Sequence, residues 1–348
     1  MKIASFFAGA GGLDLGFHQA GFEIPWANEY DKVIWSTYER NAPDTLLDRR
    51  SITDVQGADI PSVIGMIGGP PCQSWSEAGA SIGIEDQRGQ LFFEYLRLIE
   101  EKQPHFFLAE NVSGILFSRH NSALDQILGN FCELGYNVSF GLLNANHYGV
   151  PQDRDRVIIV GYRTQLKKFF TPPEPDDIQS RTVLRDAISD LVKSARSAKS
   201  DVYANEDLIV PNHEYLVSGF SSMYMSRNRV RSWDEPSFTI QAGGRHAPLH
   251  PQAPKMQLIG KDKRQFVSGS EKLYRRLTVR EAARIQTFPD DFIFEYKNVN
   301  DGYKMIGNAV PVEFARRLAM KIASDIGPFA DKKFRKIIEG DLKSFEQV

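Results

Sequence analysis

Cys72 is the residue best suited to covalent chemistry in this sequence, because it follows two prolines in Gly69-Pro70-Pro71-Cys72-Gln73. The apolar run Val63 to Ile67 precedes it and predicts a strand, so the thiol lies at a carboxyl strand end, where α/β folds bind ligands. A thiol attacks as its thiolate, which a nearby cation or helix N-terminus favours. We interpret Cys72 as a nucleophile; an incidental cysteine in a stiff loop is the alternative.

A carboxylic acid ends a second apolar run, Phe106 to Val112, where Glu110 is followed by Asn111. An acid in such a position is partly desolvated and can donate a proton near neutral pH. The same pattern also suits a helix cap. The sequence therefore predicts a general acid only in combination with other groups.

Two arginines, Arg154 and Arg156, precede a third apolar run that starts at Val157. Their guanidinium groups can bind a base carbonyl or phosphates. Pairing with the neighbouring Asp153 and Asp155 is the alternative.

A glycine-rich turn over residues 6–13 follows a predicted first strand and opens a helix. Glycine lets a ligand approach the backbone closely. A dinucleotide fingerprint would need a third glycine where Asp14 stands, and this acid would face a pyrophosphate unfavourably. A cationic, phosphate-free cofactor fits better. Glu29, near the end of the second predicted strand, is placed to bind ribose hydroxyls, unless it is a surface acid.

The elements that must position these groups alternate between short apolar runs and helical patterns. This rhythm predicts an α/β fold with a doubly wound mixed sheet, Rossmann-like in architecture. The predicted strands cover residues 2–9, 22–29, 62–69, 105–111, 136–145 and 155–163, and the predicted helices cover 13–21, a segment through Tyr38, 91–102 and 123–134.

The pattern loosens after residue 172, where prolines and polar residues become frequent. Residues 173–302 are expected to form a smaller, mostly β or irregular domain with one helix at 183–195, and helical periodicity returns at 278–286. A final helix over 312–326 follows the turn-like segment 306–311. Its apolar residues recur on one face, so we expect it to pack on a first domain of residues 1–172 and 303–348, with a charged tail beyond.

The charge of the chain is unevenly placed, although the formal net charge is only -2. Between His213 and Arg280 there are 12 Lys and Arg against 5 Asp and Glu. A basic segment on an acidic body suits an enzyme that grips nucleic acid with one part, and a solvated basic face is the alternative. The N-terminus predicts neither a signal peptide nor a membrane span, so a cytoplasmic location is expected. Cys132 lies in an apolar helical pattern and is expected to be buried, without a disulfide.

Arginines at alternate positions, Arg227, Arg229 and Arg231, would point to one side of an extended segment, and Arg245 forms a second basic site. Arginine is the commonest reader of guanine in the major groove. These residues predict a G-rich DNA site, or contacts to phosphates only.

Together these motifs resemble the DNA cytosine-5 methyltransferases, in that family's own order: FAGAGGLDLGF, GGPPCQ, AENV, QDRDRV and GYKMIGNAVPV. The segments PNHEY, MSRNRVR and LYRRLTVRE are similar to those of the HaeIII-type enzymes, which modify the inner cytosine of GGCC. The resemblance covers nearly the whole chain. It implies a restriction-modification enzyme that acts on double-stranded DNA, shares its site with a cognate restriction endonuclease, works as a monomer and needs neither metal nor membrane.

By this resemblance, Cys72 adds to the 6 carbon of a flipped-out cytosine, Glu110 serves ring N3 and Arg156 holds the O2 carbonyl. Asn111 belongs to the same motif as Glu110, and Arg154 is expected to contact a phosphate or a loop. The loop from Ser74 to Gln90 would close over the base.

The resemblance also implies S-adenosylmethionine as the cofactor. Many relatives have Gly-Asp-Ile near the adenine, whereas this chain has Arg50-Ser51-Ile52, so that Ser51 would have to accept the hydrogen bond. The expected cofactor residues are Phe7, Ala8, Gly9, Gly11, Gly12, Leu13, Glu29, Tyr30, Ser51, Ile52, Gly69, Pro71, Leu91, Asn308, Ala309 and Val310. The expected DNA-recognition residues are Arg227, Arg229, Arg231, Arg245, Gln73 and Ser76.

Three rival functions differ in class. A tRNA cytosine-5 methyltransferase would share the catalytic motifs, and the long arginine-rich insert favours DNA over it. A non-catalytic DNA-binding regulator is disfavoured by the presence of nucleophile, acid and both arginines. A nicotinamide-dependent oxidoreductase is disfavoured by the missing third glycine.

Overall fold

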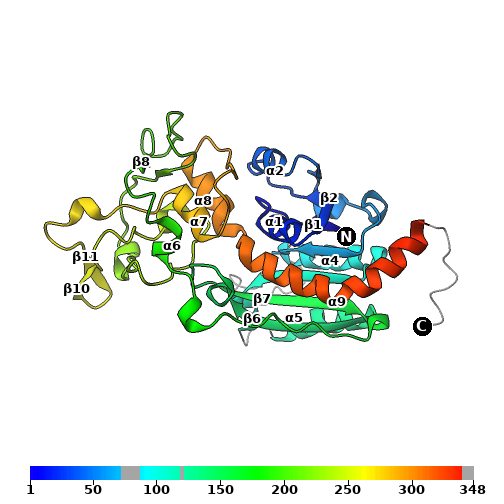
Figure 1. Ribbon diagram of the computed structural model, residues 1–348. Coiled ribbons are helices and arrows are strands. Elements are labelled where there is room, and N and C mark those ends of the chain that lie inside the picture. The colour runs from blue at the N-terminus through cyan, green and yellow to red at the C-terminus, as the bar shows by residue number, and fades with distance from the viewer. Residues whose placement is uncertain (72–86, 118–120, 339–348) are drawn as a thin grey trace.

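The computed structural model describes residues 1–71, 87–117 and 121–338. A sheet flanked by helices forms one part of the molecule, and a loop-rich part lies beside it (Figure 1). The sheet has seven strands in the order β3-β2-β1-β4-β5-β7-β6. The strands are β1 (Lys2–Phe6), β2 (Glu23–Asn28), β3 (Leu46–Asp48), β4 (Gly65–Gly68), β5 (Phe106–Val112), β6 (Tyr136–Asn144) and β7 (Asp155–Arg163).

Strand direction in the sheet is mixed. The strands from β3 to β5 are parallel, whereas β7 runs antiparallel to both β5 and β6. This confirms the predicted doubly wound mixed sheet. Only β3 was missed, because three residues are too few to show a period.

The central strands β1, β4, β5 and β7 are buried on both faces, which explains their apolar runs, whereas the edge strand β6 is partly exposed. In β5, Phe106 and Leu108 belong to the core that also contains Phe17, and the alternate residues Phe107 and Ala109 belong to a second core. The helices that cover the faces are α1 (Gly12–Gln19), α2 (Trp35–Asn41), α4 (Gln87–Lys102), α5 (Asn121–Glu133) and α9 (Val312–Ile338).

Helix α9 returns to the first part of the chain and packs on α1, as predicted. A Cβ at Gly16 would lie 2.5 Å from the Cβ of Ala315, so only glycine allows the two helices to approach this closely. The predicted apolar stripe of α9 is fully buried; it comprises Phe314, Leu318, Ile322 and Ile326. The helix continues to Ile338, beyond the predicted end at residue 326, and residues 339–348 of the expected tail lie outside the described part.

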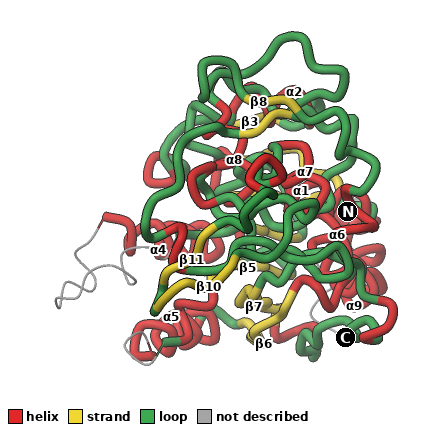
Figure 2. The backbone as a smooth tube through the Cα atoms, turned by 90° about the vertical axis from the view of Figure 1, so that its left-hand side faces the viewer, coloured by secondary structure: helices red, strands yellow, loops and turns green. Residues whose placement is uncertain are grey.

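The second part of the chain is rich in loops (Figure 2). Its regular elements are α6 (Leu184–Ile188), β8 (Arg196–Ser197), β9 (Glu214–Tyr215), the hairpin β10 (Gln257–Gly260) and β11 (Lys263–Gln265), α7 (Val279–Ile285) and α8 (Val299–Asn308). Two predictions were wrong here. The helix expected over 183–195 is only α6, and residues 306–308, expected in a turn, end α8. The expected domain boundary at residue 303 falls inside that helix.

Cys132 is exposed, which contradicts the prediction that it is buried. Helix α5 buries Leu124, Ile127 and Phe131 along one stripe, and the next residue after Phe131 is rotated about 100° away from that stripe. No helix in the described ranges has both the length and the hydropathy needed to cross a membrane.

Candidate active site

One row of paired residues fixes the edge of the sheet at which the predicted groups meet. In that row, Asp48 pairs with Asn28, Phe6 pairs with both Asn28 and Gly68, and Gly68 pairs with Ala109. Because these strands are parallel, the residues that follow the row all emerge at the same edge. The glycine-rich turn, Glu29, the proline segment and Glu110 are thereby brought together.

The glycine-rich turn is built around Glu29. The Gly9 N–H donates to Glu29 Oε2 at 2.8 Å, and the Asp31 N–H donates to Oε1 at 2.7 Å. Burial raises the pKa of Glu29, and these two hydrogen bonds oppose that effect. Phe7, Gly9 and Gly11 all have positive φ, at 51°, 56° and 87°, so the backbone folds back sharply here. A Cβ at Gly9 would meet nothing within 4 Å, which leaves room for a ligand against the turn.

The segment after α8 forms a wall against this turn. A Cβ at Gly12 would lie 2.4 Å from the Val310 carbonyl oxygen and 3.2 Å from the Ala309 Cβ. The close approach explains why glycine stands at position 12. It also places the exposed Asn308 near the beginning of α1, although the two segments are almost 300 positions apart in the sequence.

The remaining predicted cofactor residues include Ile52 and Ser51 just after β3 and Leu91 in α4. Ile52 is buried and Leu91 is half-buried, whereas Tyr30 is 71% exposed. Ser51 Oγ accepts a 2.8 Å hydrogen bond from Thr53 Oγ1, so part of its accepting capacity is used within the chain. A carboxylate held against a glycine-rich turn, with an apolar side chain such as Ile52 nearby, fits a phosphate-free nucleoside cofactor.

Glu110 and Arg156 form an ion pair at this edge, with 2.6 Å between Glu110 Oε1 and Arg156 Nε. Arg156 pairs in the β5–β7 ladder with Val112, which lies on the same sheet face as Glu110, so the two side chains are diagonal neighbours. Glu110 is 9% exposed, and a Cβ at Gly69 would lie 3.3 Å from its Oε2. The acid therefore faces the segment that leads to Cys72.

Asn111 holds that segment in place. Its Nδ2 donates to the Pro70 carbonyl oxygen at 3.1 Å, while its Oδ1 accepts from the Val112 N–H. Cys72, Gln73 and Ser76 lie outside the described residues. The structure thus brings the acid, one arginine and the anchored prolines together at the point where the described chain reaches Pro71.

Arg154 has a different position from Arg156. It is 1% exposed, and its guanidinium donates to the carbonyl oxygens of Ile240 at 3.0 Å and of Gly307 and Ala309, both at 2.9 Å. Of the two expected roles, phosphate contact or loop contact, the structure shows the loop contact. Desolvation lowers the pKa of Arg154 well below its ordinary value.

Gln152 and Gln286 were missed by sequence analysis. Gln152 Nε2 donates to Gln286 Oε1 at 3.0 Å, and Gln286 Nε2 donates to the Ile306 carbonyl oxygen at 2.7 Å. Gln152 Oε1 also accepts from the Ile240 N–H. This buried network joins the loop before β7 to the segment after α8, which packs against the glycine-rich turn. No local sequence signal reveals it.

Comparison with known proteins decides the family. Residues 1–324 match C-5 cytosine-specific DNA methylase. This chain belongs to that family. The DNA cytosine-5 methyltransferase is 56% identical over 326 residues to Type II methyltransferase M.MthTI of Methanothermobacter thermautotrophicus, covering 94% of this chain and 98% of that protein. It is 54% identical over 325 residues to Type II methyltransferase M.NgoPII of Neisseria gonorrhoeae, covering 92% and 95%.

Solved structures share the fold of the methyltransferase. Spodoptera frugiperda DNMT2 matches with a TM-score of 0.67 at 19% identity, covering 92% of this chain and 99% of that one. Entamoeba histolytica EhMeth matches with a TM-score of 0.67 at 16% identity, covering 94% and 98%.

The predicted DNA-reading arginines of the methyltransferase occupy two adjoining segments. The Leu249 N–H donates to the Arg229 carbonyl oxygen at 2.9 Å, and Tyr224 Oη donates to the Ala247 carbonyl oxygen at 2.7 Å. Arg227 and Arg245 are exposed. The two basic segments therefore lie side by side with these guanidinium groups accessible.

Arg231 does not share that accessibility. It forms ion pairs with Asp153 at 2.8 Å and Glu235 at 3.5 Å, and its guanidinium lies 4.3 Å from the centre of the Phe238 ring. Its predicted use as a base reader is not supported by these internal contacts. The pairs form because Asp153, distant in sequence, is brought next to it.

The basic segment of the methyltransferase also contains arginines that serve the core. Arg275, Arg276 and Arg280 are buried. Arg276 donates to the carbonyl oxygens of Leu216, Ser218 and Gly219. The charge excess that faces solvent is therefore smaller than the count over residues 213–280 indicates.

Proposed function

We propose that this DNA cytosine-5 methyltransferase uses S-adenosylmethionine to methylate a flipped-out cytosine in a short duplex site, the inner cytosine of GGCC. The observation that carries the proposal is the Glu110–Arg156 ion pair at 2.6 Å. It lies at the same sheet edge as Asn111, which anchors Pro70 two positions before Cys72. An acid, a cation and a nucleophile segment thus converge where one pyrimidine ring could contact all three.

The chemistry follows from the electron-poor C5 of cytosine, which needs activation before it can take a methyl group. In the proposed mechanism the Cys72 thiolate adds to C6, Glu110 delivers a proton or hydrogen bond to N3, and Arg156 stabilises charge on O2. S-adenosylmethionine, when bound, supplies an electrophilic methyl group. Loss of the C5 proton and elimination of the Cys72 thiolate then restore the aromatic ring.

The cofactor proposal is supported by the Glu29 turn. Glu29 Oε1 and Oε2 each accept one backbone hydrogen bond, which leaves lone pairs for ribose hydroxyls. The open space at Gly9 and the wall at Val310 bound the region in which the methionine portion would lie.

The target site is proposed from the loop-rich part, residues 173–302. Its exposed Arg227 and Arg245 present the donors that read guanine. Arg229 is half-buried, and its Nε donates to the Tyr224 carbonyl oxygen at 3.0 Å, so it is a weaker candidate for base reading. The Type II names of the relatives support a restriction-modification setting with a cognate endonuclease for the same site.

The experiment is transfer of labelled methyl groups to three substrates: a duplex with one GGCC, the same duplex with the site scrambled, and tRNA. Sequencing of the modified cytosines locates the product. We expect label only at the inner cytosine of GGCC, and none with Cys72→Ala. Label at another duplex sequence would refute the site, label on tRNA alone would support the RNA alternative, and full activity of Cys72→Ala would refute the nucleophile.

A further inference from the structure

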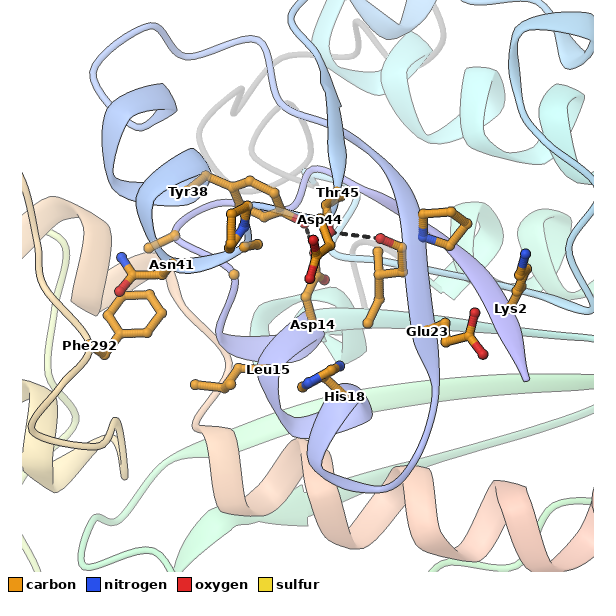
Figure 3. Close-up of a pocket in the computed structure, with 16 residues that line it drawn as sticks. Lys2, Asp14, Leu15, His18, Glu23, Tyr38, Asn41, Asp44, Thr45 and Phe292 are labelled. Atoms are coloured by element: carbon orange, nitrogen blue, oxygen red, sulfur yellow. Dashed lines mark hydrogen bonds between the residues drawn. The ribbon is translucent and has the colours of Figure 1, made fainter.

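A cavity of ≈ 400 Å³ lies between α1, β2 and the segment from Asn41 to Thr45 (Figure 3). Of the residues proposed for the cofactor, only Gly11 lines it. The cavity is therefore a different space from the one at Glu29, although both contact the glycine-rich turn. Its volume falls within the usual range for small-molecule sites, roughly 300–1,000 Å³.

The wall of this cavity contains a buried carboxylate, Asp14, which is 4% exposed. Ser5 Oγ donates to Asp14 Oδ1 and Tyr38 Oη donates to Oδ2, both at 2.6 Å. The side chain thus points toward Tyr38 (Figure 3). A carboxylate offers about four lone-pair sites, and side chains fill two of them here.

Among the described side chains, no lysine or arginine forms an ion pair with Asp14. An ionised carboxylate without a cation is costly to bury. The lining also includes four exposed charged or titratable residues, the acids Glu23 and Asp44 and the bases Lys2 and His18. The exposed charges that line the cavity therefore give no preference for an anion. The buried carboxylate of Asp14 favours a positively charged ligand.

The rest of the lining suits an apolar, flat body. Leu15, Ile24 and Pro25 contribute aliphatic surface, and the rings of Tyr38 and Phe292 contribute aromatic surface. Aromatic faces attract organic cations as well as apolar groups. From the cavity, its buried acid and these walls, we propose that this is a second binding site, which takes a small aromatic cation of the amidine or amine class with its charge directed at Asp14.

The proposal predicts a ranking among three probes of equal shape: benzamidine, benzamide and benzoate. Binding to the full chain is measured by ligand-detected NMR at pH 8, where Asp14, whose pKa burial raises to about 6, is ionised. We expect benzamidine to bind at least tenfold more tightly than benzamide, and benzoate not to bind. Equal affinities for benzamidine and benzamide would overturn the proposal.

Three variants locate the site. Asp14→Asn should reduce benzamidine affinity to that of benzamide. Ala42→Phe, which fills the cavity and keeps the acid, should abolish binding of both. Glu29→Gln tests whether the probe binds at the glycine-rich turn instead; because the charge of Glu29 acts on Asp14, benzamidine affinity should change by no more than about threefold. If Asp14→Asn does not fold, the Ala42→Phe variant tests the proposal. Unchanged benzamidine binding to Ala42→Phe would show that the probe binds elsewhere and would overturn the proposal. Loss of benzamidine binding in Glu29→Gln would do the same.

Discussion

Asn111 Nδ2 lies 3.1 Å from the Pro70 carbonyl oxygen, so a single hydrogen bond ties the end of β5 to the segment that carries the proposed nucleophile. Asn111 is buried, and the bond is therefore shielded from water. Removing it leaves a buried carbonyl without its donor, which costs about 1–3 kcal/mol. The nucleophile segment then loses its fixed position relative to Glu110.

The first prediction concerns this bond. Asn111→Leu should lower the single-turnover methylation rate by about tenfold, which corresponds to about 1.4 kcal/mol, with little effect on DNA affinity. Asn144→Ala is the control, because Asn144 bonds to Asp155 on the surface. A single-turnover rate equal to that of the wild type would refute the positioning role of Asn111.

The second prediction concerns Arg154, whose guanidinium bonds to three carbonyl oxygens of two distant segments. Lysine keeps the charge but cannot reproduce the planar set of N–H donors with which the guanidinium binds three carbonyl oxygens. Arg154→Lys should therefore raise the dissociation constant for S-adenosylmethionine about tenfold or more, as measured by calorimetry, since Ala309 leads into the wall at Val310. Arg185→Lys, which alters an exposed pair with Asp234, should leave that constant unchanged. Wild-type affinity in Arg154→Lys would show that the wall does not depend on this bond.

The third prediction separates proton transfer from binding at Glu110. Glu110→Gln keeps the shape of the side chain but removes the acid, so kcat should fall by about 10²–10⁴-fold while DNA affinity changes little. Glu101→Gln, in a surface pair with Arg97, is the matched control. Activity of Glu110→Gln within threefold of the wild type would exclude a proton-transferring role.

The fourth prediction is the pH dependence of stability at Asp14. Burial raises its pKa from 3.8 to about 6. Below pH 3.8 the carboxyl is protonated in both folded and unfolded states, whereas above pH 6 the folded state holds a buried charge. The wild type should therefore lose about 3 kcal/mol relative to Asp14→Asn as the pH rises from 3.8 through 6. Urea unfolding of both proteins across this range measures the difference; a constant difference would contradict it.

The fifth prediction distinguishes the arginines of the loop-rich part. Arg245→Ala should reduce discrimination between GGCC and a one-base variant by about 1–3 kcal/mol, because an exposed guanidinium is available to read a base. Arg231→Ala should lower the thermal midpoint and leave discrimination unchanged, since its contacts are to Asp153 and Glu235. Competition binding with the two duplexes measures the discrimination. Lost discrimination in Arg231→Ala with normal discrimination in Arg245→Ala would contradict the prediction.

Much of the sheet could be predicted from sequence, because the central strands β1, β4, β5 and β7 are apolar runs buried on both faces. The run Phe106 to Val112 is β5 over its entire length, and the glycines at 9 and 11 adopt the positive φ that their residue type allows. The parallel order of the first strands then follows from the helices between them. The strand β3 escaped prediction because three residues are too few to show a period, and helix α8 was not predicted because its burial depends on neighbours from elsewhere in the chain.

The sequence by itself determined where the acid, the arginines and the cofactor turn fall relative to their strands, since strand ends are local features. Only the tertiary structure decided how individual charges are used. Arg154 and Arg156 are two positions apart, yet one donates to carbonyls near residues 240 and 307 and the other pairs with Glu110. Arg231 is paired, while Arg227 is exposed. The physical reason is that the role of a charged side chain depends on which groups folding brings within hydrogen-bonding distance. For these arginines, groups distant in sequence decide whether the side chain is paired or exposed.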